Sequence, residues 1–166
     1  MEVGGYLTRL ETEYELIVKA RPLLEKSLTK NVRYHLNDNF LIFWFRFVYK
    51  YGYMLEVGAN QKLLDIILRD YDTFSGLMLE RYFRDEMICR GSYTRLGGWW
   101  DRKGENEIDL IGMDELEHTI DFYEVKRQRK EYDAELLRLK ADKFLSLHPE
   151  LTGYKSAIHG LTMDEM

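Results

Sequence analysis

The sequence predicts an α/β fold in which residues 72–166 form a mixed four-stranded sheet with flanking helices. Three extended segments follow one another between residues 93 and 126, separated by turn-forming and polar residues. An amphipathic helical segment comes next, and a last extended segment follows it. This spacing is typical of a helical crossover between two parallel strands, so the final strand is expected beside the third.

The composition narrows the class of protein. With 166 residues, of which 45% are hydrophobic, the chain can bury a sizeable core, which excludes global disorder. The single cysteine, Cys89, excludes an intrachain disulfide and a multi-cysteine zinc site, and favours a reducing, cytoplasmic location. A net charge of −5 means that any nucleic-acid surface must be local. No apolar run approaches the roughly 20 residues of a membrane span, and no signal peptide is expected.

Residues 1–37 show the pattern of a helix followed by a hairpin. A helix is predicted over Tyr6–Val18, a short extended segment near Val18–Ala20, and a second one over Asn31–Leu36. This order resembles the second half of a winged-helix domain whose first helices are missing. We therefore expect a partial winged-helix segment, belonging to a longer parent protein.

Residues 38–71 are expected to be a helical linker that packs between the two other parts. Asp38 or Asn39 is predicted to cap a helix over Phe40–Tyr51, whose aromatic residues surround it so fully that it should be buried. A second helix is predicted over Gln61–Asp70.

The elements of residues 72–166 can be placed individually. A helix capped by Asp72 or Thr73 is expected to end near Cys89. The three strands are predicted over Tyr93–Trp100, Glu107–Gly112 and Thr119–Lys126, the first two joined by a turn at Asp101–Gly104. A helix over Glu131–Leu147 and a strand over Tyr154–Ile158 follow. The apolar face of that helix is predicted to comprise Leu136, Leu139, Phe144 and Leu147, with the stems of Lys140 and Lys143.

Two carboxylates are predicted to meet on the second and third strands. Alternation places Asp109 on one face with Ile111, opposite to Ile108 and Leu110, and places Glu124 with Lys126. Paired carboxylates repel unless a cation lies between them, and oxygen ligands favour Mg²⁺ or Mn²⁺. Lys126 is expected to be cationic there, and to orient a water or stabilise charge on a phosphate.

This arrangement resembles the PD-(D/E)xK nuclease superfamily, also described as restriction-endonuclease-like. The resemblance implies that Asp109 and Glu124 bind Mg²⁺, that the Val125 carbonyl adds a ligand, and that Lys126 assists hydrolysis. Many members carry a further glutamate on the first helix, and Glu80 is the matching residue.

A narrower resemblance covers nearly the whole chain. It is to the C-terminal region of archaeal-type P-loop (AAA-like) ATPases, a region catalogued as a domain of unknown function. The segments that carry it are Tyr34–Asp38, Phe43–Val48, Gly97–Trp100, Glu107–Asp109 and Glu124–Lys126. It implies an upstream ATPase module as partner in the parent chain. The phosphate-binding motif G-x-x-x-x-G-K-[ST] is not found in this sequence, so ATP is expected only in that module.

Each signal also has a plainer interpretation. A second acid-x-Lys triplet, Asp101-Arg102-Lys103, falls in a turn and is set aside. Glu80 could instead pair with Arg84 on its own helix. Glu107 is expected on the same face as Asp109 but nearer the start of the strand, where it could orient a ligand of the site. Two further sets are candidates for nucleic-acid contact: the basic Arg127, Arg129 and Lys130 for phosphates, and Trp99 and Trp100 for stacking on bases. Their plainer interpretations are a solvated charged surface and one inward and one outward tryptophan.

Three classes of function remain open at this point. The first is Mg²⁺-dependent phosphodiester hydrolysis, or nucleic-acid binding descended from it. The second is a non-catalytic module for assembling the ATPase, with a vestigial nuclease fold. A transcriptional regulator is disfavoured because the predicted first helix carries Glu11, Glu13 and Glu15 against only Arg9.

Overall fold

The computed structural model describes residues 3–26 and 30–166, and the chain divides into two compact units. One unit comprises residues 1–20 and 32–74, and the other comprises residues 21–31 and 75–166. None of the helices in the described ranges is long and apolar enough to span a bilayer.

The first unit begins with a helix and a hairpin. Helix α1 covers Val3–Thr12, and strands β1 (Ile17–Ala20) and β2 (Arg33–Leu36) pair antiparallel. The helix predicted to reach Val18 is therefore too long at its C-terminal end. Glu15 adopts a left-handed backbone with φ of 52°, which ends the helical path, and the β-branched Ile17 and Val18 enter the strand.

The aromatic segment after the hairpin is helical, but its geometry changes along its length. Helix α2 covers Asn39–Phe43, a π-helix (η1) covers Trp44–Tyr49, and helix α3 covers Gly52–Glu56. The predicted cap at Asp38 is confirmed, because its side chain accepts a 2.8 Å hydrogen bond from the Leu41 N–H.

The prediction that this aromatic segment is buried all round is wrong. Phe47 is fully buried, and its ring centroid lies 5.2 Å from that of Phe43 and 5.5 Å from that of Phe74. Phe40 and Tyr49 are instead 65% and 71% exposed. Phe43 and Phe47 lie four residues apart, so one side of the helix takes the contact with Phe74 and the other side remains outside it.

The two helices predicted over residues 61–89 form a single helix. Helix α4 runs without interruption over Asn60–Arg90, so the predicted cap at Asp72 or Thr73 is wrong. No proline lies in this range, and a capping residue alone does not end a helix. Gly91 ends it, with φ of 64° and an N–H bonded to the Met87 carbonyl.

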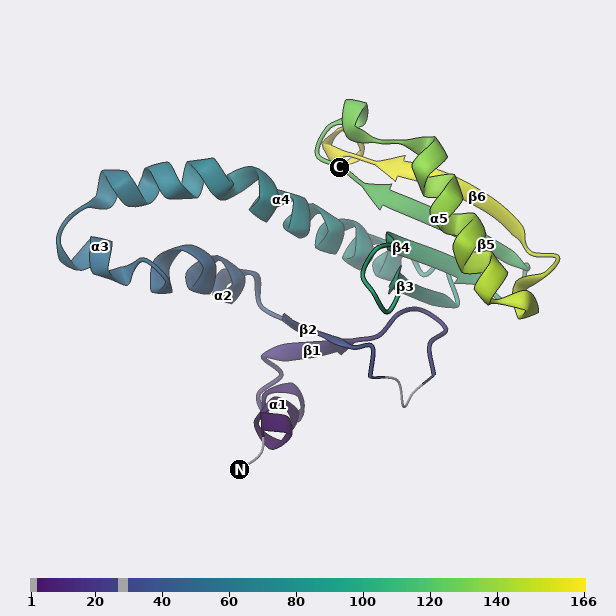
Figure 1. The fold of residues 1–166 in the computed structure, drawn as a ribbon, viewed down its shortest axis with the longest axis horizontal. Helices are drawn as coiled ribbons and strands as arrows, with labels where there is room; N and C mark the ends of the chain where they lie inside the picture. The colour runs from purple at the N-terminus through teal and green to yellow at the C-terminus, as the bar shows by residue number, and fades with distance from the viewer. Residues whose placement is uncertain (1–2, 27–29) are drawn as a thin grey trace. The chain divides into compact units, whose positions relative to one another are not determined.

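The second unit confirms the predicted mixed four-stranded sheet. Its strands are β3 (Arg95–Trp100), β4 (Glu107–Asp114), β5 (Thr119–Val125) and β6 (Lys155–Leu161), and they lie in sequence order. The first two pairings are antiparallel, and β5 pairs with β6 in parallel. Helix α5 (Ala134–Leu147), capped by Asp133, makes the predicted crossover and lies over the sheet (Figure 1).

Two layers of side chains hold this sheet between its helices. One cluster joins α5 to the strands, and its members include Leu137, Ala141, Phe144, Ile111 and Phe122. The other joins the C-terminal part of α4 to the opposite face through Leu79, Phe83, Leu110 and Val125. The predicted apolar face of α5 is only partly right, because Leu136, Leu139 and Leu147 are exposed. Its buried stripe is rotated to Leu137, Ala141 and Phe144.

A β-bulge interrupts β4 at Asp109, one of the two carboxylates of the predicted site. Gly97 pairs with Ile111 but Trp99 pairs with Ile108, so Asp109 and Leu110 together lie opposite Gly98. Ile108 consequently joins the cluster under α5, whereas Leu110 joins the cluster under α4. The prediction that Ile108 and Leu110 share a face is therefore wrong. A Cβ on Gly98 would lie 3.1 Å from the Asp109 carbonyl oxygen, so the backbones approach too closely for a side chain there.

Candidate functional site

The structure brings Asp109 and Glu124 together at one end of the sheet. Leu110 pairs with Tyr123 across β4 and β5, and the next position in this register places Asp109 beside Glu124. Asp109 Oδ2 accepts a 2.8 Å hydrogen bond from the backbone N–H of Val125, the residue after Glu124. The bulge at Asp109 and this hydrogen bond fix the aspartate at the end of β5.

Glu124 is buried between two lysines. Its residue exposure is 5%, and its Oε1 lies 3.2 Å from Lys126 Nζ and 3.3 Å from Lys140 Nζ. Its other oxygen, Oε2, is buried and accepts no hydrogen bond from any residue in the described part of the chain. A buried carboxylate oxygen without a partner is costly in a folded protein, and such a group is a reason to look for a ligand.

Two carboxyl groups at the site, those of Asp109 and Glu80, have raised pKa values. Burial raises the pKa of Asp109, and the neighbouring Glu124 adds to the rise, against the Val125 hydrogen bond and the two lysines. Burial also raises the pKa of Glu80 on α4 to about 7, and the charges of Asp109 and Glu107 add to this. Burial is the main cause of both shifts, so a divalent cation bound there would stabilise the ionised form of these carboxyl groups.

The carboxylates of the site favour the charged form of Lys126. Burial alone would lower the pKa of its ammonium group, but the Glu124 carboxylate outweighs this, and Asp109 and Glu80 contribute in the same direction. The net shift of the pKa is upward, so Lys126 is a cation at neutral pH. It can donate hydrogen bonds to water or phosphate, and it is not a general base.

The donor set suits a cation held by two carboxylates. Over residues 3–26 and 30–166, no three histidine, cysteine or acidic side chains are grouped closely enough to hold a metal ion together. Glu80 is therefore not gathered with Asp109 and Glu124 into a three-acid centre. Mg²⁺ is commonly held by one or two carboxylates with water completing its shell, so Asp109 with the unpartnered oxygen of Glu124 meets the requirement.

Lys140 belongs to the site, although sequence reasoning assigned it only a packing role. It lies on α5, and its 3.3 Å contact with Glu124 is with a partner 16 residues earlier. The sequence does indicate that Lys140 is partly buried, because it lies next to the buried residues of α5, which are Leu137, Ala141 and Phe144. A lysine in such a position needs an anionic partner, and only the fold identifies it as Glu124.

The remaining predicted residues lie apart from the carboxylate pair or have structural partners. Glu107 is exposed at the start of β4. Arg129 donates to the Gly160 carbonyl at 2.9 Å and pairs with Glu165 at 3.2 Å, and Lys130 is exposed next to it in the 3-10 helix η2 (Arg129–Glu131). Arg127 directly follows Lys126 and is intermediate in exposure.

The two tryptophans correct a further expectation. Trp99 and Trp100 are both buried, with exposures of 3% and 7%, so the prediction of one inward and one outward ring is wrong. Trp99 packs edge-on against Phe144, and the Trp100 indole N–H donates to the Asn31 side chain. Leu23 and Asn31 contact β3 at the edge of the sheet: the Leu23 N–H bonds to the Gly98 carbonyl, and Asn31 bonds to Trp100. Stacking of a base on either ring face is therefore not favoured.

Glu80 leads to a prediction about stability in the absence of metal. Its pKa is about 7 in the folded protein against an ordinary value of 4.5, so between these pH values only the folded state holds the proton. In EDTA, the free energy of unfolding should fall as the pH rises from about 4.5 to about 7, by up to about 3 kcal/mol. Urea unfolding across this range should show a flatter profile for Glu80→Gln. The exposed Glu56→Gln serves as the matched control, and an unchanged slope in Glu80→Gln would contradict the prediction.

Comparison with known proteins identifies relatives of the chain. A family model described as archaeal and bacterial proteins of unknown function matches residues 44–137. An uncharacterized protein of Methanocaldococcus jannaschii is 32% identical over 132 residues, which cover 75% of this chain and 29% of that protein. The chain thus spans less than a third of the length of this relative. No solved structure matches the chain described here.

Proposed function

The chain belongs to a family described as archaeal and bacterial proteins of unknown function, and since this description names no activity, we propose one from the geometry of the site. We propose that residues 72–166 are a PD-(D/E)xK nuclease-like domain that hydrolyses phosphodiester bonds with Mg²⁺ or Mn²⁺. The observation that carries this proposal is the buried, unpartnered oxygen of Glu124 beside Asp109, with Lys126 at the same carboxylate.

The order of elements supports the same proposal. Helix α4 is followed by β3, β4 and β5, then by α5 and β6. Asp109 lies on the second strand and Glu124-Val125-Lys126 at the end of the third, which are the positions that the nuclease motif requires. The acid-x-Lys triplet alone would be weak support, since Asp101-Arg102-Lys103 repeats it in a turn.

Each residue then has a defined role. Asp109 and Glu124 would hold the cation, with the Val125 carbonyl as a further ligand. When bound, the cation would polarise the phosphate and lower the pKa of a water molecule. Lys126, a cation at neutral pH, donates to the attacking water or to a phosphate oxygen and stabilises the charge that develops in the transition state. Lys140 holds Glu124 in place from α5.

The parent protein is proposed to contain further domains besides this chain. The M. jannaschii relative is more than three times as long as the part that this chain matches, which leaves room for further domains. We propose that α1, β1 and β2 are part of a winged helix, and that a P-loop ATPase module precedes it. ATP would bind only in that module.

A non-catalytic assembly module is the second candidate, and two observations favour it. Lys126 and Lys140 already neutralise Glu124, and the described residues hold no three-acid metal cluster. In this case the carboxylate–lysine group is a structural ion-pair network, with no requirement for a metal.

Calorimetry with added Mn²⁺ or Mg²⁺ distinguishes the two candidates. A ligand that binds only the folded state stabilises it by about 2.7 kcal/mol at 100 times its dissociation constant. We expect this gain for the wild type and for Asp142→Asn, which removes an exposed carboxylate on α5. Asp109→Asn should abolish the gain while the metal-free protein remains folded, because the substitution relieves repulsion. A wild type that gains nothing at millimolar metal would establish the assembly module instead.

A further inference from the structure

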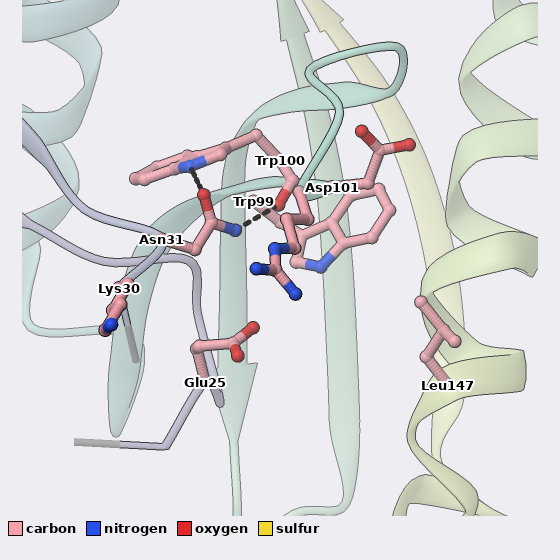
Figure 2. Close-up of a pocket in the computed structure, with 8 residues that line it drawn as sticks. Glu25, Lys30, Asn31, Trp99, Trp100, Asp101 and Leu147 are labelled. Atoms are coloured by element: carbon pink, nitrogen blue, oxygen red, sulfur yellow. Dashed lines mark hydrogen bonds between the residues drawn. The ribbon is translucent and has the colours of Figure 1, made fainter. Parts of the chain in front are cut away.

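A pocket lies at the same end of the sheet as the carboxylate pair. It is a cavity of about 360 Å³, within the range of roughly 300–1,000 Å³ that is usual for small-ligand sites. Figure 2 shows it at the end of β3, with Glu25, Lys30 and Asn31 on one side and Leu147 of α5 on the other. Its lining consists of Glu25, Lys30, Asn31, Trp99, Trp100, Asp101, Arg102 and Leu147.

One wall of the pocket is held rigid by its own hydrogen bonds. The Trp100 indole N–H donates to Asn31 Oδ1 at 2.9 Å, and Asn31 Nδ2 donates to the Trp100 carbonyl at 3.3 Å (Figure 2). Asp101 accepts from the Asn106 side chain at 2.6 Å and from Lys143 at 3.1 Å. These contacts preorganise the pocket, so little conformational entropy is lost when a ligand enters.

Trp99 supplies a hydrogen-bond donor that the fold leaves unused. Trp99 as a whole is only 3% exposed, and it lines the pocket on the side of Leu147 (Figure 2). No acceptor for its indole N–H is found among residues 3–26 and 30–166. The Nε1 atom is not among the buried, unpartnered side-chain atoms of the described residues, so it is accessible to solvent, and an indole nitrogen can only donate. The pocket therefore suits a ligand that presents an acceptor.

The pocket lies close to Asp109 along the paired strands β3 and β4. Trp99 pairs with Ile108 and Trp100 with Glu107, so the pocket begins next to the strand residues that directly precede Asp109. Two residues along a strand span about 6.6 Å, and neighbouring strands are about 4.8 Å apart. These distances are comparable with the length of one nucleotide along a single strand. A polynucleotide with a phosphate at Asp109 and Glu124 would therefore bring the adjacent nucleotide to this pocket.

We propose that the pocket receives an unpaired base of the polynucleotide, next to the phosphodiester bond that the carboxylate site cleaves. The proposal rests on the proposed nuclease function and adds that the substrate is single-stranded at this point. The lining matches a nucleotide: Trp99 donates to a ring nitrogen or carbonyl of the base, and Leu147 contacts its apolar surface. Of the four charged residues in the lining, Asp101 is paired with Lys143, so Lys30 and Arg102 face a phosphate together with the single acidic Glu25. Recognition would thus depend on the edge of the base rather than on stacking.

Tryptophan fluorescence tests this directly. The chain has three tryptophans, so Trp44→Phe leaves Trp99 and Trp100 as reporters at the pocket. In EDTA, which prevents cleavage, a single-stranded deoxythymidine oligomer of about twelve nucleotides should change their fluorescence on binding. A sugar–phosphate oligomer of the same length and charge, without bases, should bind at least about tenfold more weakly. Equal affinities for the two oligomers would overturn the proposal.

Two further variants separate the pocket from general charge. Trp99→Phe keeps an aromatic ring but removes the N–H, and should weaken binding of the base-bearing oligomer by about three- to tenfold, without affecting the abasic one. Arg102→Ala should weaken both oligomers more than Lys103→Ala, which removes the same charge outside the pocket. If Trp99→Phe weakens both oligomers equally, the donor role is wrong.

The failure of this inference can be told apart from the failure of the nuclease function. A protein that binds metal and cleaves base-bearing and partly abasic strands at the same rate would keep the function and lose the pocket. A protein that prefers the base-bearing oligomer but gains no stability from metal would keep the pocket and lose the catalysis.

Discussion

Lys126→Ala is expected to leave metal binding intact and to lower nucleic-acid cleavage by about 10²- to 10³-fold, the usual effect of removing one donor aimed at the transition state. The stabilisation by Mn²⁺ should persist, because Asp109 and the unpartnered oxygen of Glu124 remain in place. The rate should fall because the cationic donor beside Glu124 is lost. Single-turnover cleavage of a labelled oligonucleotide, together with calorimetry on the same preparation, measures both quantities.

Arg138→Ala is the matched control for this variant. Arg138 is exposed on α5, and Glu124 pairs instead with Lys126 and Lys140, so its removal takes away one positive charge from α5 without changing the carboxylate pair. The cleavage rate of this control should stay close to that of the wild type. If Lys126→Ala cleaves as fast as Arg138→Ala does, the lysine acts only as a counter-ion, and its proposed role is wrong.

Gly112→Ala is expected to destabilise the sheet by about 1–3 kcal/mol, the usual cost of forcing extra volume into a packed position. A Cβ on Gly112 would lie 2.4 Å from the Tyr93 ring, well inside van der Waals contact. The ring has no easy way to move, because the Tyr93 hydroxyl donates to Asp121 at 2.8 Å and shares a hydrogen bond with Tyr123. Urea unfolding gives the change in the free energy of unfolding.

Gly76→Ala provides the contrast. Gly76 lies inside α4, and a Cβ there meets nothing within 4 Å, so alanine should raise helix stability by up to about 1 kcal/mol. The two glycine substitutions should therefore have opposite signs. A Gly112→Ala protein as stable as the wild type would show that Tyr93 is not held in place by Asp121 and Tyr123.

Local chemistry determined much of this protein from its sequence alone. The order of strands and helices after residue 90, the Asp38 cap, the turn closed by Gly104 and the parallel crossover through α5 all follow from short-range patterns. The meeting of Asp109 with Glu124 also follows, because consecutive strands joined by a short loop become neighbours.

Tertiary structure alone decided the details of the site. Alternation cannot anticipate the bulge at Asp109, because the extra residue in β4 depends on the close approach of Gly98 on another strand. Lys140 reaches Glu124 only after α5 has crossed the sheet, and both tryptophans are buried only because α5, Leu23 and Asn31 pack against β3. These features arise from contacts between segments distant in sequence. Local patterns can indicate that Lys140 lies on a buried stripe, but they do not identify which distant residues come into contact.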